Sequence, residues 1–411
     1  MARHLPGLQV LRSSRILLRQ FGSDTSSNAF YQRNECNIDE FDRLLKHEQA
    51  SLCPSDYPLA SEIIDGVVVY DNSCFQDPKN HKNLQNEIAH AFLDGPGIVA
   101  LRGAFSHDVI DRTNVAFEKI LAQEKEEDGN KGDHFGKPGA NSRIWNVVEK
   151  LAVLSPDTFI DYFCNETIPL VSLPWIGPNY QVTAQVNIVH PGCEAQQPHR
   201  DYHLGFMSTQ EAEGYPALAH RVSAALTLQG AVAHVDMDLI SGPTLYLPHS
   251  QKYKQGYLVR NMKEFDQYFE DNHTQIPLKK GDAVFFNPAV LHAAGYNGSS
   301  DVDRIGNLLQ ISSAFGRSME TVDRARVSEA LYPTLLARQG RADWSDKQTA
   351  NVVAASSEAY SFPTNLDRDQ PVDGLAPETQ AQMVHKALRE KWSPHTFLRA
   401  LEDHSRRRKT V

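Results

Sequence analysis

Two histidines and an aspartate alternate in residues 197–203, which read Gln-Pro-His-Arg-Asp-Tyr-His. In an extended strand, side chains at every second position share one face, so we expect His199, Asp201 and His203 to point the same way. Imidazole binds borderline divalent metals, and a carboxylate adds a charged oxygen ligand. Two histidines and one carboxylate on one side of an octahedron leave positions open for other ligands, as in the facial triad of non-haem Fe(II) oxygenases.

A second segment, 93 positions downstream of His199 (292 − 199), can complete such a site. Residues 285–292 read Phe-Phe-Asn-Pro-Ala-Val-Leu-His, and His292 is the predicted third ligand. Arg304 follows 12 positions later (304 − 292). Its guanidinium is a planar fork that suits a carboxylate. If the cosubstrate is 2-oxoglutarate, Arg304 is the candidate partner for its distal carboxylate. The alternative is an exposed charge cluster formed with Asp301 and Asp303.

The composition indicates a globular protein with room for a large core. The chain has 411 residues, of which 41% are hydrophobic and 22% charged, and no run of 18 apolar residues occurs, so we expect no membrane span. The formal charge of −10 argues against a nucleic-acid partner. The 5 cysteines are scattered without a C-x-x-C pair, which argues against a disulfide framework and favours a reducing compartment.

The elements that must position these side chains are predicted from periodicity. Short strands with turns between them are expected over residues 180–315, at 181–189, 222–237, 243–248, 281–286 and 304–315. Strands at 66–70 and 98–101 and helices at 39–49, 83–93, 106–124, 143–154 and 157–163 precede them, and helices at 321–338, 377–391 and 394–404 follow. We therefore predict a mainly β fold with flanking α: a double-stranded β-helix (jelly roll, cupin-like) core braced by helices.

The chain divides into three predicted parts. Residues 1–23 contain four arginines and no acidic residue, which leaves two alternatives, a transit peptide or a disordered basic tail. Residues 24–317 form the predicted catalytic domain, with the jelly-roll core at about 180–315, and residues 318–411 a helical extension packed on it. The glycine-rich stretch 124–141 is either a solvated connection or a lid. We expect a mitochondrial or cytoplasmic protein and not a secreted one, because arginines interrupt the apolar N-terminal stretch.

Several segments, in this order, carry motifs of one enzyme family. They are Asp-Gly-Pro-Gly-Ile-Val at 94–99, His-Arg-Asp-Tyr-His at 199–203, Ser-Gly-Pro-Thr-Leu-Tyr-Leu-Pro-His-Ser at 241–250 and Lys-Gly-Asp-Ala-Val-Phe-Phe at 280–286, followed by His292 and Arg304. On these motifs the chain resembles the phytanoyl-CoA dioxygenase family of Fe(II)/2-oxoglutarate oxygenases over most of residues 84–315. Two positions depart from the family pattern, since Ser241 stands for its asparagine and His249 for a glycine.

The resemblance implies roles for individual residues. It implies iron binding by His199, Asp201 and His292. It also implies 2-oxoglutarate binding, with Arg304 as the anchor and Gln197, Thr244 and Asn187 as further candidates. For His203 and Tyr202 it implies a place on the substrate side or behind the ligands. The implied cofactor is Fe(II), with 2-oxoglutarate and O₂ as cosubstrates and ascorbate as a candidate reductant. Relatives that halogenate have a small residue at the position of Asp201, so the resemblance favours hydroxylation.

The expected activity is hydroxylation of a C–H bond in a small organic substrate, with release of succinate and CO₂. Two alternatives stay open: desaturation, epoxidation or ring rearrangement on the same fold, and a non-catalytic jelly-roll binding protein. The substrate can be an acyl-CoA, an amino acid or a secondary metabolite. Lys125, Lys131, Lys137 and Arg143 could meet the phosphates of CoA. No oligomeric state is predicted.

Overall fold

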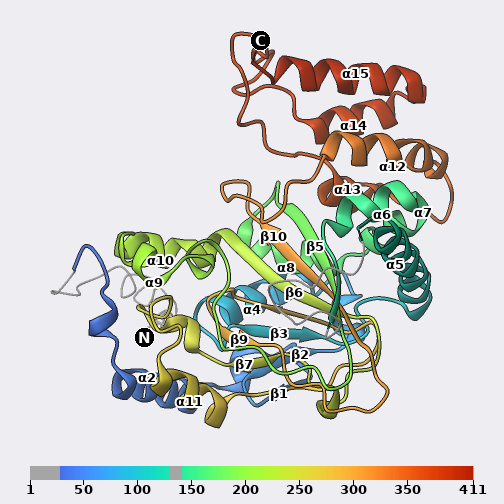
Figure 1. Ribbon diagram of the computed structural model, residues 1–411. Coiled ribbons are helices and arrows are strands. Elements are labelled where there is room, and N and C mark those ends of the chain that lie inside the picture. Colours follow the sequence, from blue (N-terminus) through green and yellow to red (C-terminus); the bar gives the residue numbers. More distant parts are fainter. Residues whose placement is uncertain (1–27, 129–140, 411) are drawn as a thin grey trace, which may run out of the picture.

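Two β-sheets lie at the centre of the computed structural model, which describes residues 28–128 and 141–410 (Figure 1). The larger sheet has 8 strands in the order β1-β2-β3-β8-β6-β10-β5-β4, and all its neighbours are antiparallel except β2 and β3. The smaller sheet pairs β7 with β9. The strands are β1 (Glu62–Ile64), β2 (Val67–Tyr70), β3 (Ile98–Leu101), β4 (Asn141–Ile144), β5 (Gln181–Val189), β6 (Thr227–Ala233), β7 (Leu245–Leu247), β8 (Ala283–Phe286), β9 (Leu291–Ala293) and β10 (Arg304–Ser312).

Helices precede, interrupt and follow the strands. They are α2 (Ile38–Ser51), α3 (Asn72–Phe75), α4 (His81–Leu93), α5 (His107–Asp128), α6 (Val147–Leu154), α7 (Pro156–Phe163), α8 (Thr167–Ile176), α9 (Thr209–Glu213), α10 (Ala217–Ser223), α11 (Lys263–Asn272), α12 (Arg324–Arg338), α13 (Asp346–Ser356), α14 (Gln380–Arg389) and α15 (Pro394–Arg407). Within the described part of the chain, no helix is both long and apolar enough to cross a membrane.

Alternating side chains of the central strands face two different cores. In β2, Val68 and Tyr70 join the cluster under the helices, whereas Val67 and Val69 join the cluster between the two sheets. β3 and β8 alternate in the same way, as expected for strands buried on both faces. The inner cluster also contains Tyr246 of β7, so the smaller sheet closes over the larger one. This arrangement confirms the predicted double-stranded β-helix core with flanking helices.

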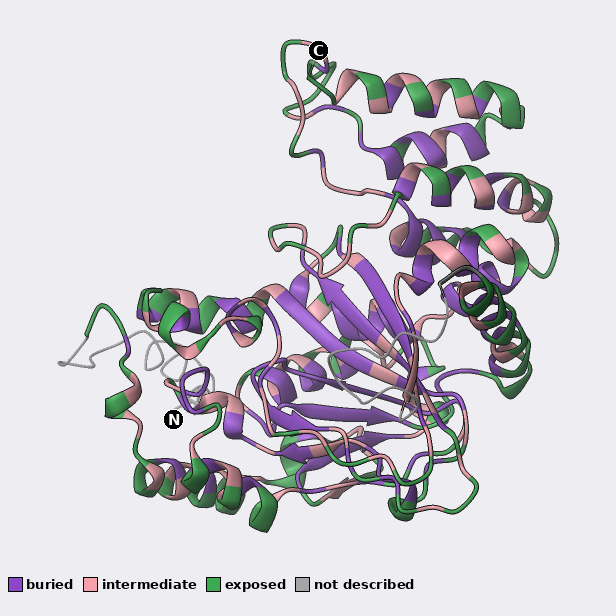
Figure 2. Ribbon diagram, viewed as in Figure 1, coloured by how far each residue is buried: buried purple, intermediate pink, exposed green. Residues whose placement is uncertain are grey.

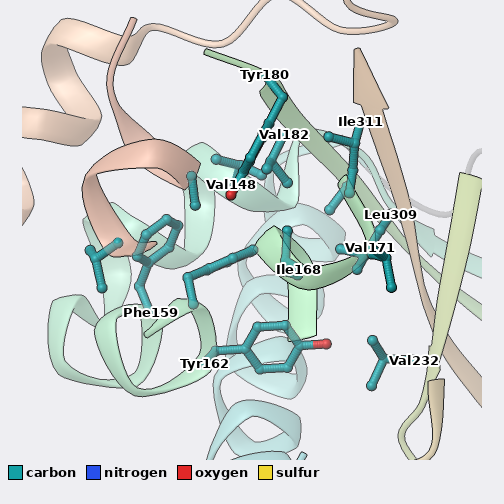
Figure 3. Packing of buried hydrophobic residues seen from close by; sticks show 14 of the residues in the cluster. Val148, Phe159, Tyr162, Ile168, Val171, Tyr180, Val182, Val232, Leu309 and Ile311 are labelled. Atoms are coloured by element: carbon teal, nitrogen blue, oxygen red, sulfur yellow. The ribbon is translucent and has the colours of Figure 1, made fainter. Parts of the chain in front are cut away.

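One face of the larger sheet is covered by helices. α8 packs on α4 and β6, while α6 packs on β5. Figure 3 shows the cluster that results, with Tyr162 and Ile168 from the helices against Val182, Val232 and Leu309 from the strands. In Figure 2 the strands are almost entirely buried, and the helices expose only their outer faces. The helices therefore leave the interior between the sheets, on the opposite face, as the place for a site.

The C-terminal helices lie farther from the sheet than we expected. α12 packs on α6 and α7 and carries α14 and α15 on its far side, so of these helices only α13 has substantial contact with a strand, β5 (Figure 1). The predicted bracing of the barrel is thus indirect for most of the 318–411 segment. The apolar cluster nevertheless runs without a break from Val182 and Ile311 through Val327 and Leu331 to Phe397.

Other differences concern element boundaries. The helix predicted at 143–154 begins only at Val147, because residues 141–144 form β4 and pair with β5. The strand predicted at 222–237 is shorter, since α10 and a 3-10 turn occupy its start. Helix α5 continues to Asp128, into the predicted loop 124–141. Residues 129–140 and the N-terminal segment 1–23 lie outside the described residues, so the lid and the leader segment stay predictions.

Candidate metal centre

Backbone pairing brings the three predicted ligands together. His199 and His292 exchange both backbone hydrogen bonds at 3.0 Å, which places residue 199 beside strand β9. The backbone N–H of Asp201 donates to the carbonyl oxygen of Pro288 at 3.1 Å. Residues 93 positions apart in the chain are therefore held in register by main-chain hydrogen bonds, which do not depend on the side chains at the site.

The three side chains converge on one point. One ligand atom each of His199, Asp201 and His292 lies within 4.8 Å of the others. The Nε2 atom of His199 is 3.6 Å from Oδ1 of Asp201, and Nε2 of His292 is 3.5 Å from Oδ2. Two imidazole nitrogens and one carboxylate oxygen form the donor set that suits Fe(II) with open coordination positions. These residues therefore fit the metal that the sequence motif implies.

The tautomer of both histidines is suited to metal binding. Nδ1 of His199 donates to the carbonyl oxygen of Gln197 at 2.8 Å, and Nδ1 of His292 donates to that of Val290 at 2.9 Å. Because a carbonyl oxygen only accepts, the proton of each neutral ring must be on Nδ1, which leaves the lone pair of Nε2 for a metal. Burial and the neighbouring His292 also lower the pKa of His199, which favours the neutral ring.

Asp201 is held in its charged form by its neighbours. Burial by itself raises the pKa of this carboxyl, but His292 and His199 in their protonated forms, together with the amide of Gln229, outweigh burial and hold the pKa well below its usual range. Nε2 of Gln229 donates to Oδ2 of Asp201. Gln229 was not predicted from the sequence. The sequence did contain a signal for it, because Gln229 is a long polar residue at an inward-facing position of β6. The next two inward-facing positions of this strand hold the small residues Ala231 and Ala233.

A cavity of about 120 Å³ surrounds the triad and reaches Arg304. The Arg304 side chain is buried, and burial lowers its pKa to about 10. Its hydrogen bonds within the described structure both come from Nη1, to the carbonyl oxygens of Ser241 at 2.8 Å and Gly295 at 3.1 Å. No carboxylate among the described residues forms an ion pair with it. A buried cation of this kind at the edge of a cavity favours an anionic ligand.

The remaining candidates are divided between the cavity and its surroundings. Thr244 and Asn187 line the cavity with Arg304. Gln197 is exposed and contributes its carbonyl oxygen to His199, and its side chain is not part of the cavity wall. Tyr202 and His203 do not line the cavity either. Our expectation that His203 shares a face with Asp201 is wrong, because residues 202 and 203 have φ of 62° and 42° and end the extended segment.

The family of the chain follows from its sequence. Residues 93–306, slightly more than half of the chain, match the family model described as Phytanoyl-CoA dioxygenase (PhyH). The chain belongs to this family. A phytanoyl-CoA dioxygenase family member with the buried His–Asp–His group described above is a non-haem Fe(II)- and 2-oxoglutarate-dependent oxygenase, with Fe(II) as its cofactor and 2-oxoglutarate and O₂ as cosubstrates.

Solved structures of other proteins show partial similarity to this phytanoyl-CoA dioxygenase family chain. The 2-oxoglutarate-dependent epimerase SnoN from nogalamycin biosynthesis is 19% identical, with 58% of this chain and 85% of that chain covered and a TM-score of 0.40. HygX from Streptomyces hygroscopicus, with nickel, 2-oxoglutarate and hygromycin B bound, is 13% identical, with 58% and 90% covered and a TM-score of 0.43. At these scores the likeness carries no information about the substrate. No curated protein sequence matches the chain.

Gln229 offers a first test of this family member's metal site. In a Gln229→Leu variant, we expect the affinity for Fe(II) or Mn(II) to fall by about 10–100-fold, because Asp201 loses the donor that orients its carboxylate. Anaerobic titration calorimetry measures this change. Gln76→Leu, at an exposed glutamine, is the control and should keep the wild-type affinity. Equal metal affinity in both variants would show that Gln229 does not support the ligand.

Arg200, between the two ligands of the motif, offers a second test. Its side chain is buried and donates through Nη2 to the carbonyl oxygen of Tyr253 at 3.1 Å, which fixes the motif to the 250–257 segment. A Cβ atom at Gly256 would lie 1.8 Å from Cζ of Arg200. We therefore expect Gly256→Ala to lower the free energy of unfolding by about 1–3 kcal/mol in urea titrations. Gly374→Ala is the control, since its Cβ would meet nothing closer than 3.8 Å. Equal stability of the two variants would contradict this tight contact.

Proposed function

We propose that the chain hydroxylates a C–H bond of a small organic substrate. In this reaction one oxygen atom of O₂ enters the substrate, and the other enters the succinate that forms from 2-oxoglutarate with loss of CO₂. The observation that carries the proposal is the convergence of His199, Asp201 and His292 in a cavity that also contains Arg304. Family membership supports the same class of reaction.

The three ligand side chains have distinct parts in this proposal. His199 and His292 offer neutral Nε2 donors, and Asp201 offers the negative charge that compensates part of the metal charge. When bound, Fe(II) supplies the activation of O₂ that the side chains cannot provide. The protein keeps the ligands on one side and leaves the cavity side for 2-oxoglutarate, O₂ and substrate.

Arg304 is the proposed anchor of 2-oxoglutarate. Its guanidinium lines the same cavity as the triad, and the described residues provide it with carbonyl acceptors but no carboxylate. The distal carboxylate of 2-oxoglutarate would supply the missing negative charge. Because the hydrogen bonds to Ser241 and Gly295 both use Nη1, Nη2 and Nε are left for this carboxylate. Thr244 and Asn187 line the same cavity and are proposed as further contacts of 2-oxoglutarate.

Hydroxylation is favoured over halogenation by the ligand set. Asp201 occupies the carboxylate position, so the protein itself supplies the third ligand and leaves no place there for a halide. Desaturation, epoxidation and ring rearrangement use the same centre, and the mass of the product separates them. Hydroxylation adds one oxygen atom, whereas desaturation removes two hydrogens.

Succinate formation tests the proposal. Anaerobically purified protein would receive Fe(II), 2-oxoglutarate and air, with ascorbate as reductant, and a panel of acyl-CoAs, amino acids and small metabolites. We expect one compound class to stimulate succinate formation and to gain 16 mass units, the mass of one oxygen atom. Bound Fe(II) and 2-oxoglutarate with no stimulation by any compound would favour the non-catalytic alternative.

A further inference from the structure

Four polar side chains from neighbouring strands form one wall of the cavity. They are Arg143 from β4, Gln185 from β5, Gln229 from β6 and Gln310 from β10. The three glutamines are at most 7% exposed. Long amides are costly to bury, and one cavity wall built from three of them needs a functional or structural reason. We call this set the amide wall.

Strand register brings the amide wall together. Gln310 and Gln229 are directly opposite each other in the β10–β6 pair, and Gln185 reaches Gln310 from β5, with Nε2 donating to Oε1 at 3.2 Å. Opposed residues in an antiparallel pair have side chains on the same face, separated by about 5 Å at Cβ. The amide groups of Gln229 and Gln310 therefore lie next to each other and face the cavity.

The orientation of every amide is set by the charged groups at the two ends. Arg143 only donates, and its Nη1 binds Oε1 of Gln185 at 3.0 Å, so Nε2 of Gln185 must be the donor to Gln310. At the other end, Asp201 only accepts, so Nε2 of Gln229 must face its carboxylate. As a result, Oε1 of Gln229 points away from Asp201.

Oε1 of Gln229 has no hydrogen-bond partner among the described residues, although it is buried. An unsatisfied buried acceptor is unfavourable, and only a donor can relieve it. 2-Oxoglutarate carries two carboxylates and a keto oxygen and has no donor at neutral pH. This acceptor is therefore open to a donor group on another molecule that enters the cavity. Nε2 of Gln310, whose Oε1 is already used, can in turn donate to that molecule.

We propose that the amide wall binds the substrate through a hydroxyl or amine group. The substrate class is then small polar alcohols or amines. This refinement rests on the function proposed above. A hydroxyl group can donate to Oε1 of Gln229 and accept from Nε2 of Gln310 at the same time. A fatty acyl chain offers neither group and would bury methylene groups against three amides. Because Gln229 also donates a hydrogen bond to Asp201, the hydroxyl or amine group of the substrate would lie beside the metal centre.

Matched pairs of small molecules test this class. Full-length protein loaded with Mn(II) and saturated with 2-oxoglutarate would be titrated with trans-1,2-cyclohexanediol, inositol and glucosamine, and with derivatives in which methyl groups replace the O–H and N–H protons. Broadening of the ligand NMR lines by Mn(II) reports binding near the metal, with Zn(II) protein as the diamagnetic blank. We expect the donor-bearing member of a pair to bind about tenfold more tightly, as for one lost hydrogen bond.

A variant then assigns the effect to the amide wall. In Gln310→Leu, the preference for the donor-bearing member should fall by about tenfold. The affinities for Mn(II) and 2-oxoglutarate should stay unchanged, because Gln310 is hydrogen-bonded to Gln185, which is neither a metal ligand nor a proposed contact of 2-oxoglutarate. Gln310→Met keeps the side-chain length and replaces Leu if that variant folds poorly. Gln76→Leu is the matched control.

The outcomes separate this inference from the proposed function. Equal binding of methylated and unmethylated members, no binding of any member, or preferred binding of octanoyl-CoA would overturn the amide wall as a polar substrate site, while bound Mn(II) and 2-oxoglutarate would leave the oxygenase assignment of the residues intact. A protein that takes up neither Mn(II) nor 2-oxoglutarate would overturn both.

Discussion

Replacement of His292 by alanine is expected to abolish Fe(II) binding and, with it, succinate formation. His292 supplies one of three protein donors, its Nε2 lies 3.5 Å from Oδ2 of Asp201, and the side chain is buried. Loss of an outer hydrogen-bonding partner already costs about 10–100-fold in metal affinity, so loss of a ligand should exceed about 100-fold. Anaerobic calorimetry with Fe(II), and succinate measured by NMR, report the two quantities independently.

The control for this variant is a second buried histidine far from the cavity. His404 in α15 donates from Nε2 to the carbonyl oxygen of Glu378 at 3.1 Å and lies among the C-terminal helices. His404→Ala can lower stability but should keep the wild-type affinity for Fe(II). If His292→Ala bound one Fe(II) per chain as tightly as wild type, the proposed ligand set would be wrong.

Replacement of Arg304 by leucine is expected to weaken 2-oxoglutarate binding without loss of the metal. Removing one partner of a buried, hydrogen-bonded charge pair costs about 2–5 kcal/mol, which corresponds to roughly 30–4000-fold in affinity. Titration of Mn(II)-loaded protein with 2-oxoglutarate gives the dissociation constant directly. Arg304→Lys should bind with intermediate affinity, because the charge remains but the hydrogen bonds from Nη1 to Ser241 and Gly295 change.

Arg102 provides the matched control for Arg304. It is an exposed arginine whose Nη2 pairs with Glu62 at 2.6 Å, so Arg102→Leu removes a positive charge outside the cavity. This variant should keep the wild-type affinity for 2-oxoglutarate. Similar affinities in the Arg304 and Arg102 variants would mean that the anionic ligand is held elsewhere, and the cosubstrate assignment would have to be revised.

The part of the site that the sequence predicts best is the part carried by short segments. His199 and Asp201 are two positions apart, so one extended segment suffices to align them, and the 285–292 stretch identifies His292. The same local logic fails at His203, because positive φ values at 202 and 203 turn the chain. A period-two pattern predicts a shared face only while the backbone stays extended.

The amide wall and the outer helices could not be predicted in this way. Gln229 and Gln310 are ordinary polar residues of separate strands. Their positions side by side in the cavity wall depend on the β10–β6 register, which is set by long-range pairing. β4 was missed for the same reason, since Arg143 is placed by its partner Asn187 in β5. Helical periodicity did locate α12, α14 and α15, but it does not report that their apolar faces meet other helices rather than the sheet.

The reciprocal backbone pairing of His199 and His292 has a consequence for how such a protein can diversify. The chain between them is a loop closed at the metal centre, and the entropy of closing a loop changes only slowly with its length. Insertions around α9 and α10, where Leu218 and Val222 are exposed, would therefore leave the spacing of the two histidines untouched. Laboratory evolution could thus lengthen the exposed side of the 209–223 segment without changing the backbone pairing at the metal centre.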